Sequence, residues 1–333
     1  MGDTSIEWTK GDDGTSGKTW NPVRGCSRVS AGCEHCYAER VAARFSGPGQ
    51  PYEGLARMDE GQARWSREVR LVPEHLADPL RWKRPRRVFV NSMSDVFHEK
   101  LTNEEIAAVF GVMAATPRHT FQVLTKRPER MRDWFRWASR YGQSIHATTV
   151  LREQATLFIG ATRPRASFGR DVDLDAMLRS DAVWPLPHVW LGVSVEDQRR
   201  ADERIPLLLA TPAAVRFVSA EPLLEGVDLS RWLDWRTHRK CEHCSAIGPD
   251  GEVCPHCRKV GLAFPALDWV ICGAESGSGA RPMKLDWARW LREQCAGAGV
   301  PFFLKQFADE HGRKVSLPIL DGRQHVAWPG NRR

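Results

Sequence analysis

The sequence predicts an α/β protein built as a full or partial (β/α) barrel, and two recurring patterns carry this prediction. The first is a short apolar run, rich in Val, Phe and Ile, that ends in polar or charged residues. Such runs are typical of buried parallel strands. The second is a helical pattern between the runs, as in a barrel whose strands and helices alternate. The apolar runs are residues 88–95, 120–127, 189–196, 215–222, 269–275 and 301–306.

Two of the helical segments have recognisable starts and buried faces. Residues 102–105, Thr-Asn-Glu-Glu, form a capping box, which typically begins a helix. Asp286 is expected to cap the last clear helix. The apolar positions expected to face the core are Ile106, Val109, Phe110 and Met113 in the first helix, and Ala288, Leu291 and Cys295 in the last.

We interpret the chain of 333 residues as a single barrel domain, residues 1–333. Two gaps between strands are longer than one helix needs, so residues 136–186 and 230–266 are expected to be insertions. An open doubly wound sheet is the alternative, but no glycine-rich phosphate turn follows the first strand. The tail from Asp309 carries little helix or strand signal.

A loop near the N-terminus carries three cysteines, Cys26, Cys33 and Cys36. Three thiolates in so short a span can hold three irons of a cubic [4Fe–4S] cluster and leave the fourth iron without a protein ligand. Gly25 suits the tight backbone that wraps such a cluster. A structural zinc ion would need a fourth ligand, which only His35 supplies locally, with little room to turn inward. A zinc knuckle or core cysteines are the alternative interpretation.

A second cysteine motif lies in the 230–266 insertion. Two CxxC pairs at this spacing are typical of four thiolates that close a tetrahedral zinc site. A closed site has no open position, so we expect a structural zinc ion in a small zinc-ribbon-like insertion. An auxiliary iron–sulfur cluster is the alternative, because four cysteines suit either metal. The ligands are Cys241, Cys244, Cys254 and Cys257.

Charged residues at the ends of the predicted strands are expected to converge at one active face, because the loops after barrel strands form it. The alternative is that half of them only cap helices or pair with one another. Cys272 also ends a strand, and it is either a buried free thiol or a catalytic thiol placed to donate a hydrogen atom. The charged strand-end residues are Asp95, Lys126, Arg127, Glu196, Glu221, Glu275 and Lys305.

The net charge of +7 favours a polyanionic partner such as nucleic acid. The densest basic cluster, residues 81–87, precedes a strand and is expected at the opposite end of the barrel. A polar, acidic N-terminus and the lack of a long apolar run predict a cytoplasmic protein with no membrane partner. The predicted nucleic-acid contacts, which follow strands, are Lys126, Arg127, Arg130, Arg199, Arg200, Arg281 and Lys284.

In addition to the cysteine loop, four short sequence motifs resemble those of a known family. They are residues 19–22 (TWNP), 91–95 (NSMSD), 124–128 (LTKRP) and 273–277 (GAESG). Together with the loop they resemble the radical SAM superfamily. More closely, they resemble a phage-associated three-cysteine-motif family that is distantly similar to spore photoproduct lyase. The likeness spans about residues 4–308 outside the two insertions. Tyr37 looks like the aromatic residue that adjoins the last cysteine in that superfamily.

The resemblance implies an enzyme in which S-adenosylmethionine (SAM) binds the open iron and an electron donor reduces the cluster. A 5′-deoxyadenosyl radical then abstracts hydrogen from the substrate. It places Ser94 and Asp95 near the methionine amino group, with Ser194, Glu196 and Glu221 as further cofactor contacts.

Together with the positive charge, the resemblance favours repair or modification of a nucleic-acid base. Two alternatives stay open. One is a non-enzymatic nucleic-acid-binding protein with two structural zinc sites, and the other is a radical SAM enzyme that acts on a peptide or small molecule.

Overall fold

A computed structural model describes most of the chain, and its contacts divide the chain into two compact units, residues 1–191 and 192–333. The sequence predicted one domain. None of the helices in the described residues is both long enough and apolar enough to cross a membrane. The described residues are 3–141, 147–162, 184–233, 239–240, 247–248, 262–263, 266–277, 279–308 and 313–330.

All six predicted strands form, and the predicted parallel pairing is confirmed. Eight strands share one sheet in the order β1-β6-β7-β8-β9-β13-β14-β15. Among the described residues the order has two ends, so this sheet is open and mostly parallel rather than closed into a full barrel. The six strands are β6 (Arg87–Val90), β7 (Thr120–Thr125), β8 (Val189–Ser194), β9 (Val215–Ala220), β13 (Trp269–Gly273) and β14 (Phe302–Ala308).

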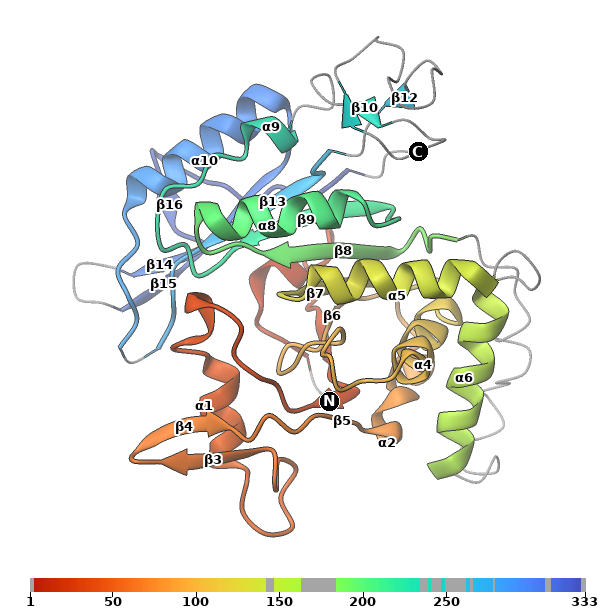
Figure 1. Cartoon of the computed structure of the whole chain (residues 1–333). Helices are drawn as coiled ribbons and strands as arrows, with labels where there is room; N and C mark the ends of the chain where they lie inside the picture. The colour runs from red at the N-terminus through yellow and green to blue at the C-terminus, as the bar shows by residue number, and fades with distance from the viewer. Residues whose placement is uncertain are drawn as a thin grey trace. The chain divides into compact units, whose positions relative to one another are not determined.

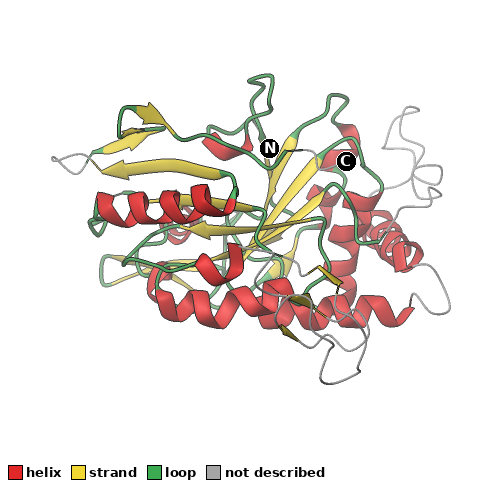
Figure 2. Ribbon diagram, turned by 90° about the horizontal axis from the view of Figure 1, so that it is seen from above, coloured by secondary structure: helices red, strands yellow, loops and turns green. Residues whose placement is uncertain are grey.

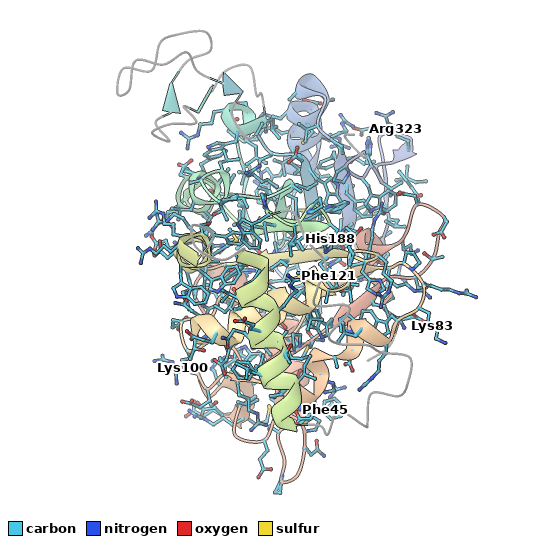
Figure 3. The ribbon with its side chains drawn as sticks, turned by 90° about the vertical axis from the view of Figure 1, so that its right-hand side faces the viewer. Phe45, Lys83, Lys100, Phe121, His188 and Arg323 are labelled. Carbon is cyan, nitrogen blue, oxygen red and sulfur yellow. The ribbon has the colours of Figure 1, made fainter. Side chains whose placement is uncertain are left out.

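In the first unit, β6 pairs in parallel with β7 and with a strand that the sequence did not predict, β1 (Lys18–Trp20). Phe121 of β7 donates its backbone N–H to His188 just before β8, at 2.8 Å, and the two rings lie close together (Figure 3). Strand β1 has only three residues, too few for a recognisable apolar run.

Helix α4 (Asn103–Ala114) joins β6 to β7 and has the predicted capping box and buried stripe. Helices α5 (Pro128–Tyr141) and α6 (Ala147–Thr162) follow β7, and α6 lies inside the predicted 136–186 insertion. Figure 1 shows α6 beside α4, where a Cβ at Gly111 would approach the Leu151 carbonyl oxygen to 2.0 Å. Part of the predicted insertion therefore packs against the core of this unit.

Smaller elements precede β6 in the first unit. Two of them, β3 and β4, form an antiparallel hairpin that packs on helix α1. Figure 2 draws the elements by type. Their bounds are η1 (Glu7–Thr9), β2 (Val23–Arg24), η2 (Ala31–Cys33), α1 (Tyr37–Arg44), β3 (Ala56–Asp59), β4 (Gln62–Trp65), β5 (Arg70–Leu71), α2 (Pro73–Leu76) and α3 (Asp78–Arg81).

In the second unit, β13 pairs in parallel with both β9 and β14. Helix α10 (Leu285–Ala298) buries the predicted face. The predicted Asp286 cap is wrong: Lys284 is the N-cap residue without a side-chain cap bond, and the Asp286 carboxylate accepts from Arg289 at 2.7 Å. The other helices are α8 (Gln198–Leu209) and α9 (Ser230–Leu233).

The tail was expected to carry little regular structure, but it forms three short strands. The first, β15 (Lys314–Ser316), joins β14 antiparallel and ends the sheet. The others are β16 (Ile319–Leu320) and β17 (Arg323–Gln324). In the 230–266 insertion, β10 (Arg239–Lys240), β11 (Ile247–Gly248) and β12 (Leu262–Ala263) form a small antiparallel sheet.

Candidate functional site at the three-cysteine loop

The three-cysteine loop connects β2 to α1 in the first unit. Its entry needs a glycine, because Gly25 has a φ of +89° and a Cβ there would lie 2.0 Å from the Glu68 carbonyl oxygen. Cys33 ends the short helix η2, and Cys36 is the N-cap residue of α1. Cys26 and Cys36 pack against a buried cluster that includes Trp65 of β4. The local backbone thus fixes all three cysteines on one short, braced segment.

The environment of the thiols combines burial with positive charge. Burial raises the pKa of Cys26 to about 12, while the charge of Arg127 acts in the opposite direction. Burial also raises the pKa of Cys36, opposed by the backbone N–H of Glu39 and by the charge of Lys126. In the metal-free chain both thiols therefore keep their protons at neutral pH. Positive groups that favour a thiolate already face them.

The donor chemistry of this loop fits an iron–sulfur cluster. Cys33 acts electrostatically on both Cys26 and Cys36. The described residues contain no group of three or more His, Cys, Asp or Glu side chains that could hold a metal ion. A single metal ion needs all its ligands around one point. In a cubic cluster each thiolate binds a different iron atom, so the ligands need not meet at one point. Cys26, Cys33 and Cys36 would hold such a cluster.

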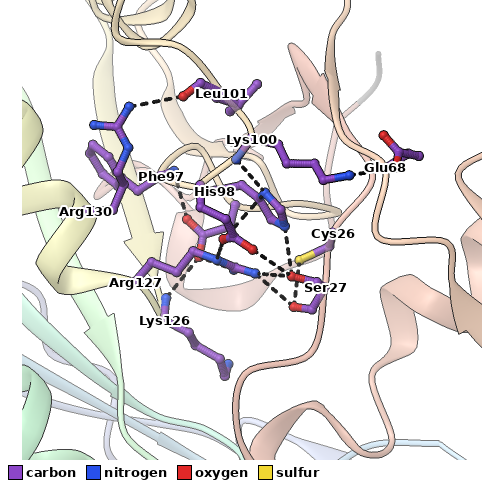
Figure 4. A network of polar contacts seen from close by, with 12 residues as sticks. Cys26, Ser27, Glu68, Phe97, His98, Lys100, Leu101, Lys126, Arg127 and Arg130 are labelled. Atoms are coloured by element: carbon purple, nitrogen blue, oxygen red, sulfur yellow. Dashed lines mark hydrogen bonds and ion pairs between the residues drawn. The ribbon is translucent and has the colours of Figure 1, made fainter.

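Arg127, which directly precedes α5, connects the strand ends to the cysteine loop (Figure 4). Its guanidinium pairs with Asp95 at 3.2 Å and with Glu99 at 2.8 Å. It also donates to the carbonyl oxygen of Ser27, the neighbour of Cys26, at 3.0 Å. Burial alone would lower the pKa of Arg127, but the charge of Asp95 raises it, so Arg127 stays charged. It was predicted as a phosphate contact, whereas the geometry gives it a positioning role.

Asp95 is buried, and donors from the chain surround its carboxylate. Its two oxygens accept from Thr125 Oγ1 at 2.8 and 2.9 Å, from the backbone N–H of Phe97 at 3.0 Å and from that of Lys126 at 3.1 Å. With Arg127, these donors fill the acceptor sites of a carboxylate. The predicted role of Asp95 as a cofactor contact stays a prediction, and in this geometry the group organises the ends of β6 and β7.

The strand-end turn after β6 is bound to both the loop and the N-terminal segment. Ser94 was predicted to contact the cofactor, and its hydroxyl donates to the Val23 carbonyl oxygen at 2.8 Å. The Tyr37 hydroxyl donates to the Ser92 carbonyl oxygen. Asn21 Oδ1 accepts from the Met93 backbone N–H at 3.2 Å. The strings at 19–22 and 91–95 therefore meet in space.

Sequence reasoning missed three residues of this network, Ser27, His98 and Glu99. His98 Nδ1 accepts the Lys100 backbone N–H at 3.2 Å, so we assign the ring proton to Nε2, which donates to Ser27 Oγ at 2.9 Å. Burial lowers the pKa of His98, and the nearby charge of Arg127 adds to this effect. The usable signal was the string Asp95-Val96-Phe97-His98-Glu99, which continues the strand-end motif with two more polar residues.

In the second unit, the predicted cofactor contact Glu196 is fully buried and pairs with Arg204 at 2.9 Å. The same guanidinium donates to the carbonyl oxygen of Ser194, another predicted contact, at 2.8 Å. The third, Glu221, pairs with Lys305 and accepts from Gln306 Nε2 at 3.2 Å. Two predicted strand-end residues, Glu221 and Lys305, thus converge.

Cys272 lies in the core strand β13 of the second unit and is fully buried. Burial raises its pKa, and the negative charge of Glu221 adds to this rise. A protonated, enclosed thiol matches the interpretation as a buried free cysteine, and the catalytic role stays a prediction. The zinc ligands Cys241, Cys244, Cys254 and Cys257 lie outside the described residues.

The predicted nucleic-acid contacts fall into two groups. Most are engaged within the chain: Arg199 and Arg200 pair with Glu203, Arg281 pairs with Glu275, and Arg130 donates to the Leu101 carbonyl oxygen. Across the described part of the chain, no carboxylate lies within ion-pair distance of Lys126 or Lys284. Figure 4 shows the Lys126 side chain directed away from the Arg127 network.

Comparison with known proteins gives one family. A family model described as "Protein of unknown function (DUF5131)" matches residues 3–329. No curated protein and no solved structure matches the chain. Since the family model covers nearly the whole chain, including the cysteine loop and both units, the chain belongs to the DUF5131 family.

Proposed function

We propose that this chain is a radical SAM enzyme that repairs or modifies a nucleic-acid base, with a [4Fe–4S] cluster held by Cys26, Cys33 and Cys36. One observation carries the proposal: three thiols share a braced loop, and two cations, Arg127 and Lys126, act on them. When bound, such a cluster supplies the electron that cleaves the sulfonium of SAM to a 5′-deoxyadenosyl radical. The open parallel sheet supports a partial-barrel interpretation.

The side chains around the cysteine loop would have different roles. Arg127 fixes the loop by bridging Asp95 to the Ser27 carbonyl oxygen, so the cluster ligands keep one geometry. Lys126 directly follows β7 and its charge acts on Cys36, so its ammonium would be available to bind the carboxylate of SAM. Cys26 and Cys36 are partly buried against the cluster that includes Trp65, which limits the access of water to these ligands. The net charge of +7 supports a nucleic-acid substrate.

The experiment is anaerobic reconstitution of the full chain, followed by metal analysis and turnover with SAM and a reductant. We expect about four irons per chain in the cluster loop and release of 5′-deoxyadenosine. Cys26→Ala, Cys33→Ala and Cys36→Ala should each lose both signals. Cys295→Ala, which removes a buried thiol from α10, is the matched control and should keep both.

Two results would overturn parts of the proposal. Zinc in both cysteine motifs with no iron would leave a non-enzymatic zinc protein. Release of 5′-deoxyadenosine together with no salt-dependent binding to DNA or RNA would point to a peptide or small-molecule substrate.

A further inference from the structure

A pocket of about 600 Å³ opens beside the cysteine loop within the first unit. Its lining comes from four places: Ser27 and Arg28 after Cys26, Glu39 of α1, the β3–β4 hairpin with the residues that follow it, and Glu99. The volume lies within the range of small-ligand sites. Ser27 joins the pocket to the cluster loop, because it is the residue next to Cys26 and also contacts Arg127.

Four arginines and three acids line the pocket, and the acids are already engaged. Glu39 is buried and accepts from Arg28 Nε at 3.0 Å. Glu99 pairs with Arg127 at 2.8 Å. The third acid, Asp59, lies 3.8 Å from the guanidinium of Arg57.

Two guanidinium groups are left without a carboxylate partner in the described residues, those of Arg64 and Arg67. Arg64 donates only to uncharged groups, the Ala63 carbonyl oxygen at 3.2 Å and the Gln62 side chain. The pocket therefore carries an excess of positive charge in a partly enclosed site, which attracts an anion.

The segment that presents these two arginines is held in place. Trp65, between them, is buried and donates its backbone N–H to Glu39 Oε1 at 2.8 Å. Ser66 donates its hydroxyl to the Gly54 carbonyl oxygen at 2.7 Å. Arg67 has a φ of +70°, a conformation that costs a non-glycine residue on the order of 1 kcal/mol. These contacts fix the backbone of Arg67 at the pocket.

We propose that this pocket binds a backbone phosphate of the nucleic-acid substrate, with Arg64 and Arg67 as its ligands. Guanidinium groups bind phosphate oxygens in pairs of parallel hydrogen bonds, and a phosphodiester offers them two non-bridging oxygens that share one negative charge. A phosphate held here would place the neighbouring nucleotide beside the cysteine loop. The inference rests on the proposed function for the identity of the substrate, whereas the phosphate site rests on the pocket itself.

The test measures the affinity of anaerobically prepared full-length protein for a labelled single-stranded oligonucleotide, as DNA and as RNA, over a series of salt concentrations. The test variant is Arg64→Gln/Arg67→Gln. The control is Lys83→Gln/Arg84→Gln, which removes the same charge from exposed positions, and Figure 3 shows Lys83 directed outward. Thermal unfolding of each variant checks that the fold is kept.

We expect the pocket variant to lose about tenfold or more in affinity at low salt, and the control to lose much less. The slope of log affinity against log salt should become shallower by about 0.7, because the one phosphate bound by both arginines on a single strand is no longer neutralised. Equal losses in both variants would overturn the site. Competition by a mononucleotide, with no binding of the oligonucleotide, would overturn the backbone assignment in favour of a free nucleotide.

Iron content and SAM cleavage, measured on the same preparations, separate this inference from the proposed function. A pocket variant that binds normally while the wild type carries iron and cleaves SAM overturns the phosphate site alone. Loss of oligonucleotide binding in the pocket variant supports the phosphate site even if the wild type carries no iron, in which case the proposed function fails by itself.

Discussion

Arg127 is a buried, charged residue that contacts the cysteine loop directly. Its side chain is 8% exposed and that of Asp95 is 6% exposed, so the pair is almost fully removed from water. A buried charge is costly when its partner is removed, because the remaining ion can neither reach solvent nor be neutralised. The same guanidinium favours the thiolate of Cys26. Both the free energy of unfolding and the binding of the cluster should therefore depend on Arg127.

We expect Arg127→Gln to lower the free energy of unfolding by about 3 kcal/mol or more and to reduce iron retention. Urea unfolding and iron analysis measure the two effects. Arg130→Gln is the matched control: Arg130 lies one turn further along α5 and donates to the Leu101 carbonyl oxygen at 3.1 Å. It should cost about 1 kcal/mol and leave iron content unchanged. Equal effects in both variants would remove the positioning role from Arg127.

We expect His119 to make the stability of the first unit depend on pH. It is buried, its Nε2 donates to the Pro79 carbonyl oxygen at 3.1 Å, and its Nδ1 has no partner among the described residues. Burial lowers its pKa from 6.5 to about 4. The unfolded chain therefore binds a proton that the folded chain does not bind between these values. The free energy of unfolding should fall as the pH drops through this window and be fully restored above 6.5.

The predicted size of this effect is at most about 3 kcal/mol, at 1.36 kcal/mol for each pKa unit. His119→Gln keeps a donor for Pro79 and removes the titrating ring, so its unfolding free energy should change less between pH 6.5 and 4. Urea unfolding at several pH values measures the difference. An unchanged pH dependence would show that other groups cause it.

At the scale of elements, the packing of α6 on α4 depends on one glycine. A Cβ at Gly111 would lie 2.0 Å from the Leu151 carbonyl oxygen and 2.9 Å from Ala155 Cβ, and backbone cannot move aside cheaply. Gly111→Ala should therefore destabilise the chain by about 1–3 kcal/mol, although alanine favours the helix itself. Gly297→Ala in α10 is the control, because no atom lies within 4 Å of its added Cβ.

The two substitutions should shift the midpoint of thermal unfolding in opposite directions. The control gains up to about 1 kcal/mol of helix propensity without a clash. If Gly111→Ala is also stabilising, the two helices separate easily and α6 is a peripheral insertion, as the sequence first suggested.

The elements that the sequence predicted well are those whose signal is local. The six apolar runs and the Thr102 capping box need only neighbouring residues to be recognised, and the structure contains all of them. Elements with a weak local signal were missed. Strand β1 is three residues long and pairs with β6, about seventy positions away. Strand β15 is equally short and forms because β14 offers it an edge. Asp286 failed as a cap because the helix already begins at Leu285, so Asp286 lies inside its first turn.

The same distinction holds for the site. The three cysteines share a loop that the sequence alone could identify. The partners of the strand-end residues could not be predicted, because Asp95 meets Thr125 and Arg127 across some thirty positions of sequence. The proposed phosphate pocket was also missed, because the sequence does not show which arginines lack a carboxylate partner in the folded chain.

At the scale of the whole molecule, the chain carries two cysteine motifs that should act independently. In the second unit the segment that holds the predicted zinc ligands leaves α9 and returns before β13. The Leu267 backbone N–H donates to the Trp232 carbonyl oxygen at 2.9 Å, so the ends of this segment meet. Strands β9 and β13 then pair directly from Trp269 to Cys272. The sheet is therefore continuous without a contribution from the zinc ligands.

We predict that Cys244→Ala loses the zinc, about one ion per chain, and keeps the iron and the release of 5′-deoxyadenosine. Cys33→Ala should do the reverse, because its thiol belongs to the loop at the start of α1 in the first unit. Metal analysis of both variants and of the wild type measures the iron and the zinc content per chain. If Cys244→Ala loses iron in proportion to zinc, the two motifs fold as one metal-dependent body. The hydrogen bond from the Leu267 N–H to the Trp232 carbonyl oxygen would then not be enough to let the insertion fold independently of the first unit.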